Sequence, residues 1–198
     1  MFISEHCEFV EWSSPLIENC SNFSCKHDKD IEQFFKTEFE YYDKQLLGKS
    51  YGFVKTKPSL ELVAAFTVSN SMLPVVNFPK SIKNRINRQK PNPKRNSQYP
   101  AVLIGQLAVF DAFSGMRIGD EVLSFIKGWF IEPLNKTGCR YVVVDAVNND
   151  KVIDFYQRNG FKFIFDKIED EIEYMKLDME PEYKRTRLMY FDLIVLKS

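Results

Sequence analysis

One short segment of this chain is suited to holding an anion. Residues 114–119, Ser-Gly-Met-Arg-Ile-Gly, lie between an apolar run and the start of an amphipathic pattern, where a strand is expected to turn into a helix. The first N–H groups of a helix have no intrahelical partner and, with the helix dipole, bind phosphate. Glycines at such a turn also serve ordinary turn geometry, so the segment alone leaves both interpretations open.

The elements around this turn follow from the apolar spacing. The run 101–110 predicts a strand, and apolar residues three and four apart after Ile118 predict a helix that ends before Pro133. Residues 141–147 are nearly all apolar, as in a strand covered on both faces. Together these segments predict a β-α-β unit with a parallel pair of strands.

The remaining elements are predicted in the same way. Asn148 or Asn149 can cap a short helix that Gly160 ends, and strands are expected at 161–165 and 187–196. In the first half, a helical stripe over 28–47 precedes two strands at 51–54 and 60–68.

Charge is unevenly distributed along the chain. The 198 residues carry 27 basic and 27 acidic side chains, so no global field favours nucleic acid or acidic partners. Between 70 and 99, however, there are seven basic residues and no acidic one, which predicts an exposed basic insertion. Between 166 and 182 there are eight acidic residues against Lys167 and Lys176.

Composition excludes several classes of protein. No apolar stretch reaches the roughly 20 residues that a membrane span needs, and the N-terminus does not resemble a secretion signal, so we expect a cytoplasmic protein with no membrane contact. The four cysteines contain no C-x-x-C pair, which predicts reduced thiols and no metal site.

The order of these elements, ending in Phe155-Tyr156-x-x-x-Gly160-Phe161, resembles the GNAT superfamily of acyl-CoA-dependent N-acetyltransferases. The resemblance is carried by residues 101–165. It implies an α/β (α+β) fold with a mixed, mostly antiparallel sheet, helices on both faces and a splayed central parallel pair of strands. We therefore expect a single domain over 1–198 that uses acetyl-CoA.

The resemblance also implies which residues contact the coenzyme. The family pattern Gln/Arg-x-x-Gly-x-Gly/Ala, whose amides bind the pyrophosphate, falls on Ser114, Arg117 and Gly119, so two of its three positions differ here. Asn149 matches an asparagine that binds the coenzyme, and its alternative role is a helix cap. The implied contact residues are Leu107, Ala108, Val109, Ser114, Gly115, Met116, Arg117, Ile118, Gly119 and Asn149.

Tyr156 matches the family tyrosine that lies near the coenzyme sulfur. A phenol at that place can protonate the thiolate as an amine attacks the thioester. The base is undecided between Asp145, Glu38, Glu40 and ordered water, and an α-amine needs less help because its pKa is near neutral. Cys139 lacks a histidine partner and is not expected to be a nucleophile.

Phe23-Ser-Cys25 before a helix, with the basic segment, looks like the toxin branch that acetylates aminoacyl-tRNA, although Lys26 replaces the usual glycine. Lys83, Arg85 and Arg88 then become candidate tRNA contacts; the alternatives are a solvated loop or compensation by the acidic segment. The branch implies an antitoxin partner, and a homodimer is a further expectation. The alternative functions are acetylation of a protein or small-molecule amine, and non-catalytic acyl-CoA binding.

Overall fold

The structure is a computed structural model that describes residues 1–20, 23–26, 28–88, 97–135 and 137–197. The chain forms two compact units, Met1–Ser69 with Ile104–Trp129, and Asn70–Leu103 with Phe130–Ser198. The single domain expected over residues 1–198 stays a prediction.

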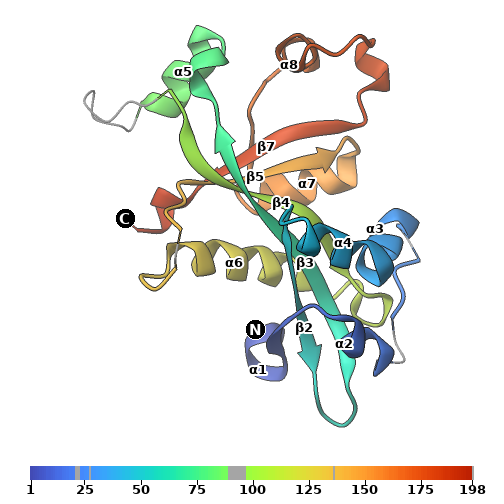
Figure 1. Cartoon of the computed structure of the whole chain (residues 1–198). Helices are drawn as coiled ribbons and strands as arrows, with labels where there is room; N and C mark the ends of the chain where they lie inside the picture. The colour runs from blue at the N-terminus through green and yellow to red at the C-terminus, as the bar shows by residue number, and fades with distance from the viewer. Residues whose placement is uncertain (21–22, 27, 89–96, 136, 198) are drawn as a thin grey trace. The chain divides into compact units, whose positions relative to one another are not determined.

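Seven strands are hydrogen-bonded in the order β1-β2-β3-β4-β5-β7-β6 (Figure 1). They are β1 (Glu8–Glu11), β2 (Lys49–Lys55), β3 (Glu61–Leu73), β4 (Tyr99–Val109), β5 (Tyr141–Val147), β6 (Lys162–Phe163) and β7 (Thr186–Asp192). Among the described residues, β4 and β5 form the one parallel pair of this mostly antiparallel sheet. The predicted fold class and its parallel pair are confirmed, whereas the splaying of that pair stays a prediction.

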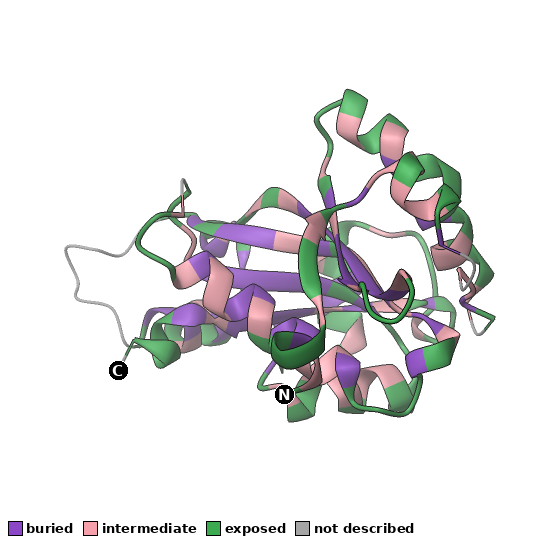
Figure 2. Ribbon diagram, turned by 90° about the horizontal axis from the view of Figure 1, so that it is seen from below, coloured by how far each residue is buried: buried purple, intermediate pink, exposed green. Residues whose placement is uncertain are grey.

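The α-helices are α1 (Phe2–His6), α2 (Ser14–Glu18), α3 (Lys29–Gln33), α4 (Phe39–Lys44), α5 (Lys80–Asn87), α6 (Ile118–Ile131), α7 (Asp150–Arg158) and α8 (Ile168–Met175). The shorter helical turns are η1 (Phe34–Glu38, a π-helix), η2 (Val75–Asn77), η4 (Asp111–Phe113), η5 (Pro181–Tyr183) and η6 (Leu193–Leu196). Within the described ranges, no helix has both the length and the apolar character needed to cross a membrane. Buried positions follow the strands, and exposed positions gather on helices and loops (Figure 2).

In the first unit, the helix expected over 28–47 is confirmed as the continuous run of α3, η1 and α4. Asp28 caps it by accepting hydrogen bonds from the first-turn amides, and Phe35 and Phe39 point into the core against Trp12. The π-helical turn was not predicted. Within it, the carbonyl of Phe35 accepts a 2.8 Å hydrogen bond from the indole of Trp12, which fixes the helix to the segment after β1.

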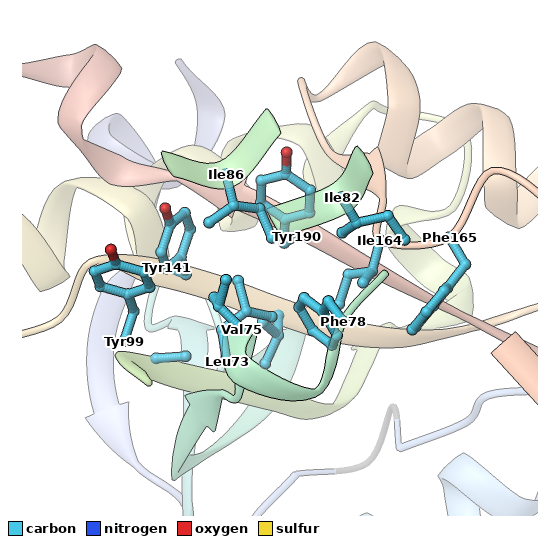
Figure 3. Close-up of a cluster of buried hydrophobic side chains, with 12 residues drawn as sticks. Leu73, Val75, Phe78, Ile82, Ile86, Tyr99, Tyr141, Ile164, Phe165 and Tyr190 are labelled. Carbon is cyan, nitrogen blue, oxygen red and sulfur yellow. The ribbon is translucent and has the colours of Figure 1, made fainter. Parts of the chain in front are cut away.

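In the second unit, the exposed basic insertion expected over 70–99 is wrong for its described part. β3 extends to Leu73, and α5 buries Ile82 and Ile86 in a cluster with Tyr141 and Tyr190 (Figure 3). The apolar residues of α5 are four apart, so one face of the helix is apolar while basic side chains occupy the rest. Three of the seven basic residues in this predicted segment lie outside the described residues: Lys90, Lys94 and Arg95.

Two strand ends in the second unit also differ from expectation. β6 contains only Lys162–Phe163, and β7 ends at Asp192 because its carboxylate accepts a hydrogen bond from the Ile194 amide and starts η6. Over its length β7 pairs with β5, from Tyr141 opposite Asp192 to Val147 opposite Thr186.

A buried carboxylate joins α8 to β7. Glu171, fully buried in the acidic segment, accepts hydrogen bonds from Arg187 Nε and from the Leu188 amide, both at 2.9 Å. Lys184 Nζ lies 3.4 Å from the same carboxylate. Buried charges need partners of this kind, so part of the acidic segment belongs to the core of this unit.

Candidate functional site

The end of β4, in the first unit, carries the predicted contact residues Leu107, Ala108 and Val109. Phe110 N donates to Val63 O at 3.1 Å, so this residue faces β3. Successive residues of a strand direct their backbone groups to opposite edges, and Leu107 and Val109 therefore face away from β3. Ala108 is buried in the hydrophobic core of the unit.

The turn between β4 and α6 has an unusual backbone. Gly115 has φ +81°, and Arg117 has φ +59°, which is the left-handed region that costs a non-glycine residue roughly 1–2 kcal/mol. Glycine, which the sequence pattern predicts at this position, would adopt this conformation without cost. Arg117 therefore has a backbone conformation that favours glycine.

Several N–H groups at this turn have no partner. Within the part of the chain that the structure describes, nothing accepts hydrogen bonds from the amides of Gly115, Arg117, Ile118 or Gly119. A side chain at Gly115 would meet no atom within 4 Å, so the approach to the turn is open. Unpaired amides at the start of a helix form an anion-binding site.

The charges at this turn are already partly balanced. Arg117 Nε lies 2.9 Å from Asp120 Oδ2, and the Arg117 side chain is 77% exposed. Although the Asp120 side chain is only 17% exposed, the guanidinium is open to solvent, and an ion pair at the surface contributes little to stability. The guanidinium can therefore turn towards a phosphate, while Ser114 and Met116 leave the turn surface uncharged.

The sequence does not predict a set of hydrogen bonds beside the end of β4 that join Asp111 to residues 24 and 26, here called the clasp. The carboxylate of Asp111 accepts hydrogen bonds from Ser24 Oγ at 2.6 Å and from the Lys26 amide at 3.2 Å, and its own amide donates to Ser24 O. Residues 23–26 are thereby held against the residue that follows Phe110. No local pattern signals a contact between positions 87 residues apart.

A second unforeseen contact ties the N-terminus to α6. The carboxylate of Glu121 accepts hydrogen bonds from the amides of Phe2 at 3.0 Å and Ile3 at 2.8 Å, so it caps α1. The first turn of α6 therefore fixes the start of the chain in the same unit.

In the second unit, Asn149 caps a helix, which is one of the two roles expected for it. Its Oδ1 accepts a 2.9 Å hydrogen bond from the Val152 amide at the start of α7. Asn148 instead donates to the carbonyl of Lys184. The capping bond uses one lone pair of the Asn149 oxygen, and the side-chain amide nitrogen can still donate to a ligand.

Tyr156 lies on α7 between two aromatic rings. Its ring centroid is 5.0 Å from that of Phe155 and 5.3 Å from that of Phe161. Gly160, with φ +83°, turns the chain so that the Phe161 amide donates back to the Tyr156 carbonyl. Burial raises the pKa of the Tyr156 hydroxyl to about 12, so it keeps its proton at neutral pH.

The candidate general bases differ in their hydrogen bonds and in their exposure to solvent. The carboxylate of Glu40 accepts hydrogen bonds from Ser14 and Lys44, and these lower its pKa, which weakens it as a base. Asp145 and Glu38 are exposed. Ordered water remains the fourth alternative.

The three predicted nucleic-acid contacts on or beside α5 differ in their surroundings. Arg85 donates to Asp166 at 2.7 Å and to the carbonyl of Phe163 at 3.0 Å, so the acidic segment neutralises it as one expectation had it. Arg88 is exposed and Lys83 half-buried. Among the described residues neither forms an ion pair.

No protein-family model matches the chain, and no curated protein matches it in sequence. Solved structures match over nearly its whole length. A tyrosine-to-phenylalanine mutant of KacT has 16% identity and a TM-score of 0.66, covering 98% of each chain. AtaT complexed with acetyl-methionyl-tRNAfMet has 14% identity and a TM-score of 0.64, with 96% of this chain and 97% of that chain covered.

A third structure, of a bacterial toxin, has 13% identity and a TM-score of 0.69, with 96% of this chain and 93% of that chain covered. At such identities the match concerns the fold. The chain has the fold of these toxin structures, which is the GNAT-type fold expected from its sequence.

Proposed function

We propose that this protein is an acyl-CoA-dependent N-acetyltransferase that transfers an acetyl group to a primary amine by direct attack. The observation that supports it most is the left-handed backbone of Arg117 at a turn where four amides have no acceptor among the described residues. Strained conformations of this kind persist where function requires them. In this proposal the amides of 115–119 bind the coenzyme pyrophosphate, and the strand edge at 107–109 binds the pantetheine arm.

The chain's own residues would then perform two tasks. When bound, acetyl-CoA would supply an acetyl thioester. A neutral amine would form a bond to its carbonyl carbon as the C–S bond breaks, and the proton lost by the nitrogen would pass to one of the candidate bases or to water. The hydroxyl of Tyr156 donates the proton to that sulfur, which its raised pKa allows because the phenol stays protonated in neutral solution. The backbone of Leu107 and Val109 orients the acyl group, and no covalent enzyme intermediate is needed.

We further propose the α-amine of aminoacyl-tRNA as the acceptor. AtaT has been solved with acetyl-methionyl-tRNAfMet, and its mutant toxin with acetyl-CoA and the C-terminus of the antitoxin AtaR. By analogy with AtaT bound to AtaR, a small antitoxin is the proposed regulatory partner. A cytoplasmic site of action and a homodimer are proposed from the sequence alone. Asn149 contributes through its amide nitrogen to coenzyme binding.

Cell-free translation with added acetyl-CoA tests this proposal. We expect the wild type to inhibit translation only when acetyl-CoA is present, and peptidyl-tRNA hydrolase to restore it. Tyr156→Phe keeps the ring contacts but removes the proton donor, so the rate of acetyl transfer should fall about 10²–10⁴-fold.

Tyr183→Phe is the matched control, because Tyr183 is 66% exposed and lies in η5. It should inhibit translation as the wild type does. If translation is untouched while acetyl-CoA is consumed with peptide or small amines, the acceptor is not aminoacyl-tRNA. If no amine supports turnover, the chain is not an acetyltransferase.

A further inference from the structure

A cavity of about 380 Å³ in the second unit takes no part in the proposed acetyl transfer. It lies between α5, β6 and the end of β7, and its lining includes Arg88, Lys162, Tyr141 and Tyr190. Its volume falls within the range of sites that hold small organic groups, which is roughly 300–1,000 Å³. Both tyrosine rings belong to the hydrophobic cluster described above.

The charges around this cavity are predominantly positive. Asp192, its acidic lining residue, is engaged by Arg140 at 2.7 Å, and Arg85 is engaged by Asp166 at 2.7 Å. Arg88 and Lys162 are exposed, and no carboxylate in the described ranges pairs with either. Two uncompensated cations therefore stand at the opening, which favours an anionic ligand.

The floor of the cavity offers hydrogen-bond donors. The hydroxyls of Tyr141 and Tyr190 point the same way, out of the cluster of apolar side chains (Figure 3). Burial raises the pKa of each, so both hydroxyls keep their protons at neutral pH. Arg140 donates a hydrogen bond to the Tyr141 oxygen and Arg85 to the Tyr190 oxygen, and each O–H group remains a donor. The Nε group of Arg85 is also buried and has no hydrogen-bond partner among the described residues.

The walls of the cavity are apolar. Ile86, Val195 and Phe191 line it beside the tyrosine rings. A bare phosphate would satisfy the cations and hydroxyls but would leave this apolar surface uncovered. A phosphate that carries a flat ring would cover both, because a nucleobase packs against aromatic and aliphatic side chains.

We propose that this cavity binds one nucleotide unit of a single-stranded RNA, with Arg88 and Lys162 on the phosphate and the base against the apolar wall. A concave site can admit a splayed nucleotide, whereas a duplex presents its phosphates on a convex surface. The choice of RNA over a free nucleotide rests on the proposed action on tRNA. The site differs from the predicted basic patch because it recruits Lys162 from β6 and does not include Lys83.

Fluorescence anisotropy with a labelled, 5′-phosphorylated RNA tetranucleotide tests the site, and AMP serves as the free-nucleotide competitor. We expect Arg88→Ala combined with Lys162→Ala to weaken RNA binding at least about tenfold. Tyr190→Phe keeps the ring and removes one donor, and should weaken it about fivefold. Lys80→Ala is the matched control, since Lys80 is an exposed lysine of α5 outside the cavity lining, and should change binding less than about twofold.

Equal losses in the double variant and in Lys80→Ala would overturn the proposal, because binding would then reflect general charge. Binding of AMP without binding of the RNA would overturn RNA as the source. The readout is independent of acetyl transfer. Acetyl-CoA turnover by the wild type with a small amine reports the proposed function separately, so either conclusion can fail while the other stands.

Discussion

Arg117 holds a left-handed backbone conformation although its side chain is that of an ordinary L-residue. Its φ of +59° is one that glycine adopts freely. We expect Arg117→Gly to raise the free energy of unfolding by about 1 kcal/mol, less a small loss from the exposed pair with Asp120. Thermal unfolding with and without coenzyme A would measure both stability and binding.

In the same experiment, the affinity for coenzyme A should stay within about threefold if the amides carry the contact. A loss greater than about tenfold would assign phosphate binding to the guanidinium instead. Arg117→Val is the contrasting variant, because a β-branched residue tolerates this conformation poorly.

The raised pKa of Tyr156 predicts how the rate of acetyl transfer depends on pH. Its pKa is raised to about 12 by burial, so its proton is retained across the assay range and only the amine titrates. The kcat/KM for an α-amine should therefore rise with pH with a midpoint near pH about 8, and level off between about pH 9 and about pH 10. A fall between pH 8 and 10 in the wild type that is absent from Tyr156→Phe would contradict the burial argument.

Among the elements, the segment 23–26 depends on one carboxylate. Asp111→Ala removes the acceptor for Ser24 and for the Lys26 amide, and should lower the free energy of unfolding by about 2 kcal/mol. If the segment borders the acceptor, KM for the amine should rise while KM for acetyl-CoA changes little. Steady-state kinetics with a small amine separates the two constants.

Ser24→Ala is the milder companion variant, since it removes one of these hydrogen bonds and leaves the Lys26 amide bonded to Asp111. An unchanged amine KM in Asp111→Ala, despite lower stability, would make the clasp purely structural.

The α8–β7 contact depends on Glu171. Glu171→Ala leaves Arg187 and Lys184 buried without their counter-charge, and should cost about 3–5 kcal/mol of folding free energy. Urea unfolding would measure this. Glu173→Ala, two residues along the same helix and exposed, should change stability by less than about 0.5 kcal/mol. Similar small effects in both would mean that the cluster opens to water.

The elements that the sequence predicted well are those whose signals are local. α6, β5 and α7 follow from apolar spacing, a capping asparagine and Gly160, all within a few residues. The prediction of an exposed segment over 70–99 relied on its seven basic residues. It did not take into account the apolar residues four apart, Ile82 and Ile86, which pack into the core of the second unit. The burial of Glu171 depends on partners 13 or more residues away in β7 and its approach, which no local pattern contains.

For the candidate site, the turn and Tyr156 could be found because the sequence motifs carry them. The Asp111 clasp and the Glu121 cap could not, since each joins segments more than 80 residues apart. The sequence predicts only part of the cavity beside α5. Arg88, which follows α5, is a candidate contact from the sequence, but Lys162 lines the same cavity from β6, and no local pattern predicts this.

At the scale of the whole molecule, the fold is retained at very low sequence identity. The chain matches toxin structures at 13–16% identity with TM-scores of 0.64 to 0.69, while no family model matches it. A sheet requires apolar side chains at alternate positions and not particular ones, so sequences can diverge widely within one fold. The motifs at the turn and around Tyr156 therefore carry more functional information than overall identity does.

The division into two compact units limits how recombination can exchange parts of this chain. The chain passes between them at 69/70, 103/104 and 129/130, and each crossing falls inside β3, β4 or α6. Recombination that replaced one unit with that of a homologue would need three breakpoints, each within a hydrogen-bonded element. The two units should therefore descend together, and diversification by insertion should concentrate in loops such as 56–60.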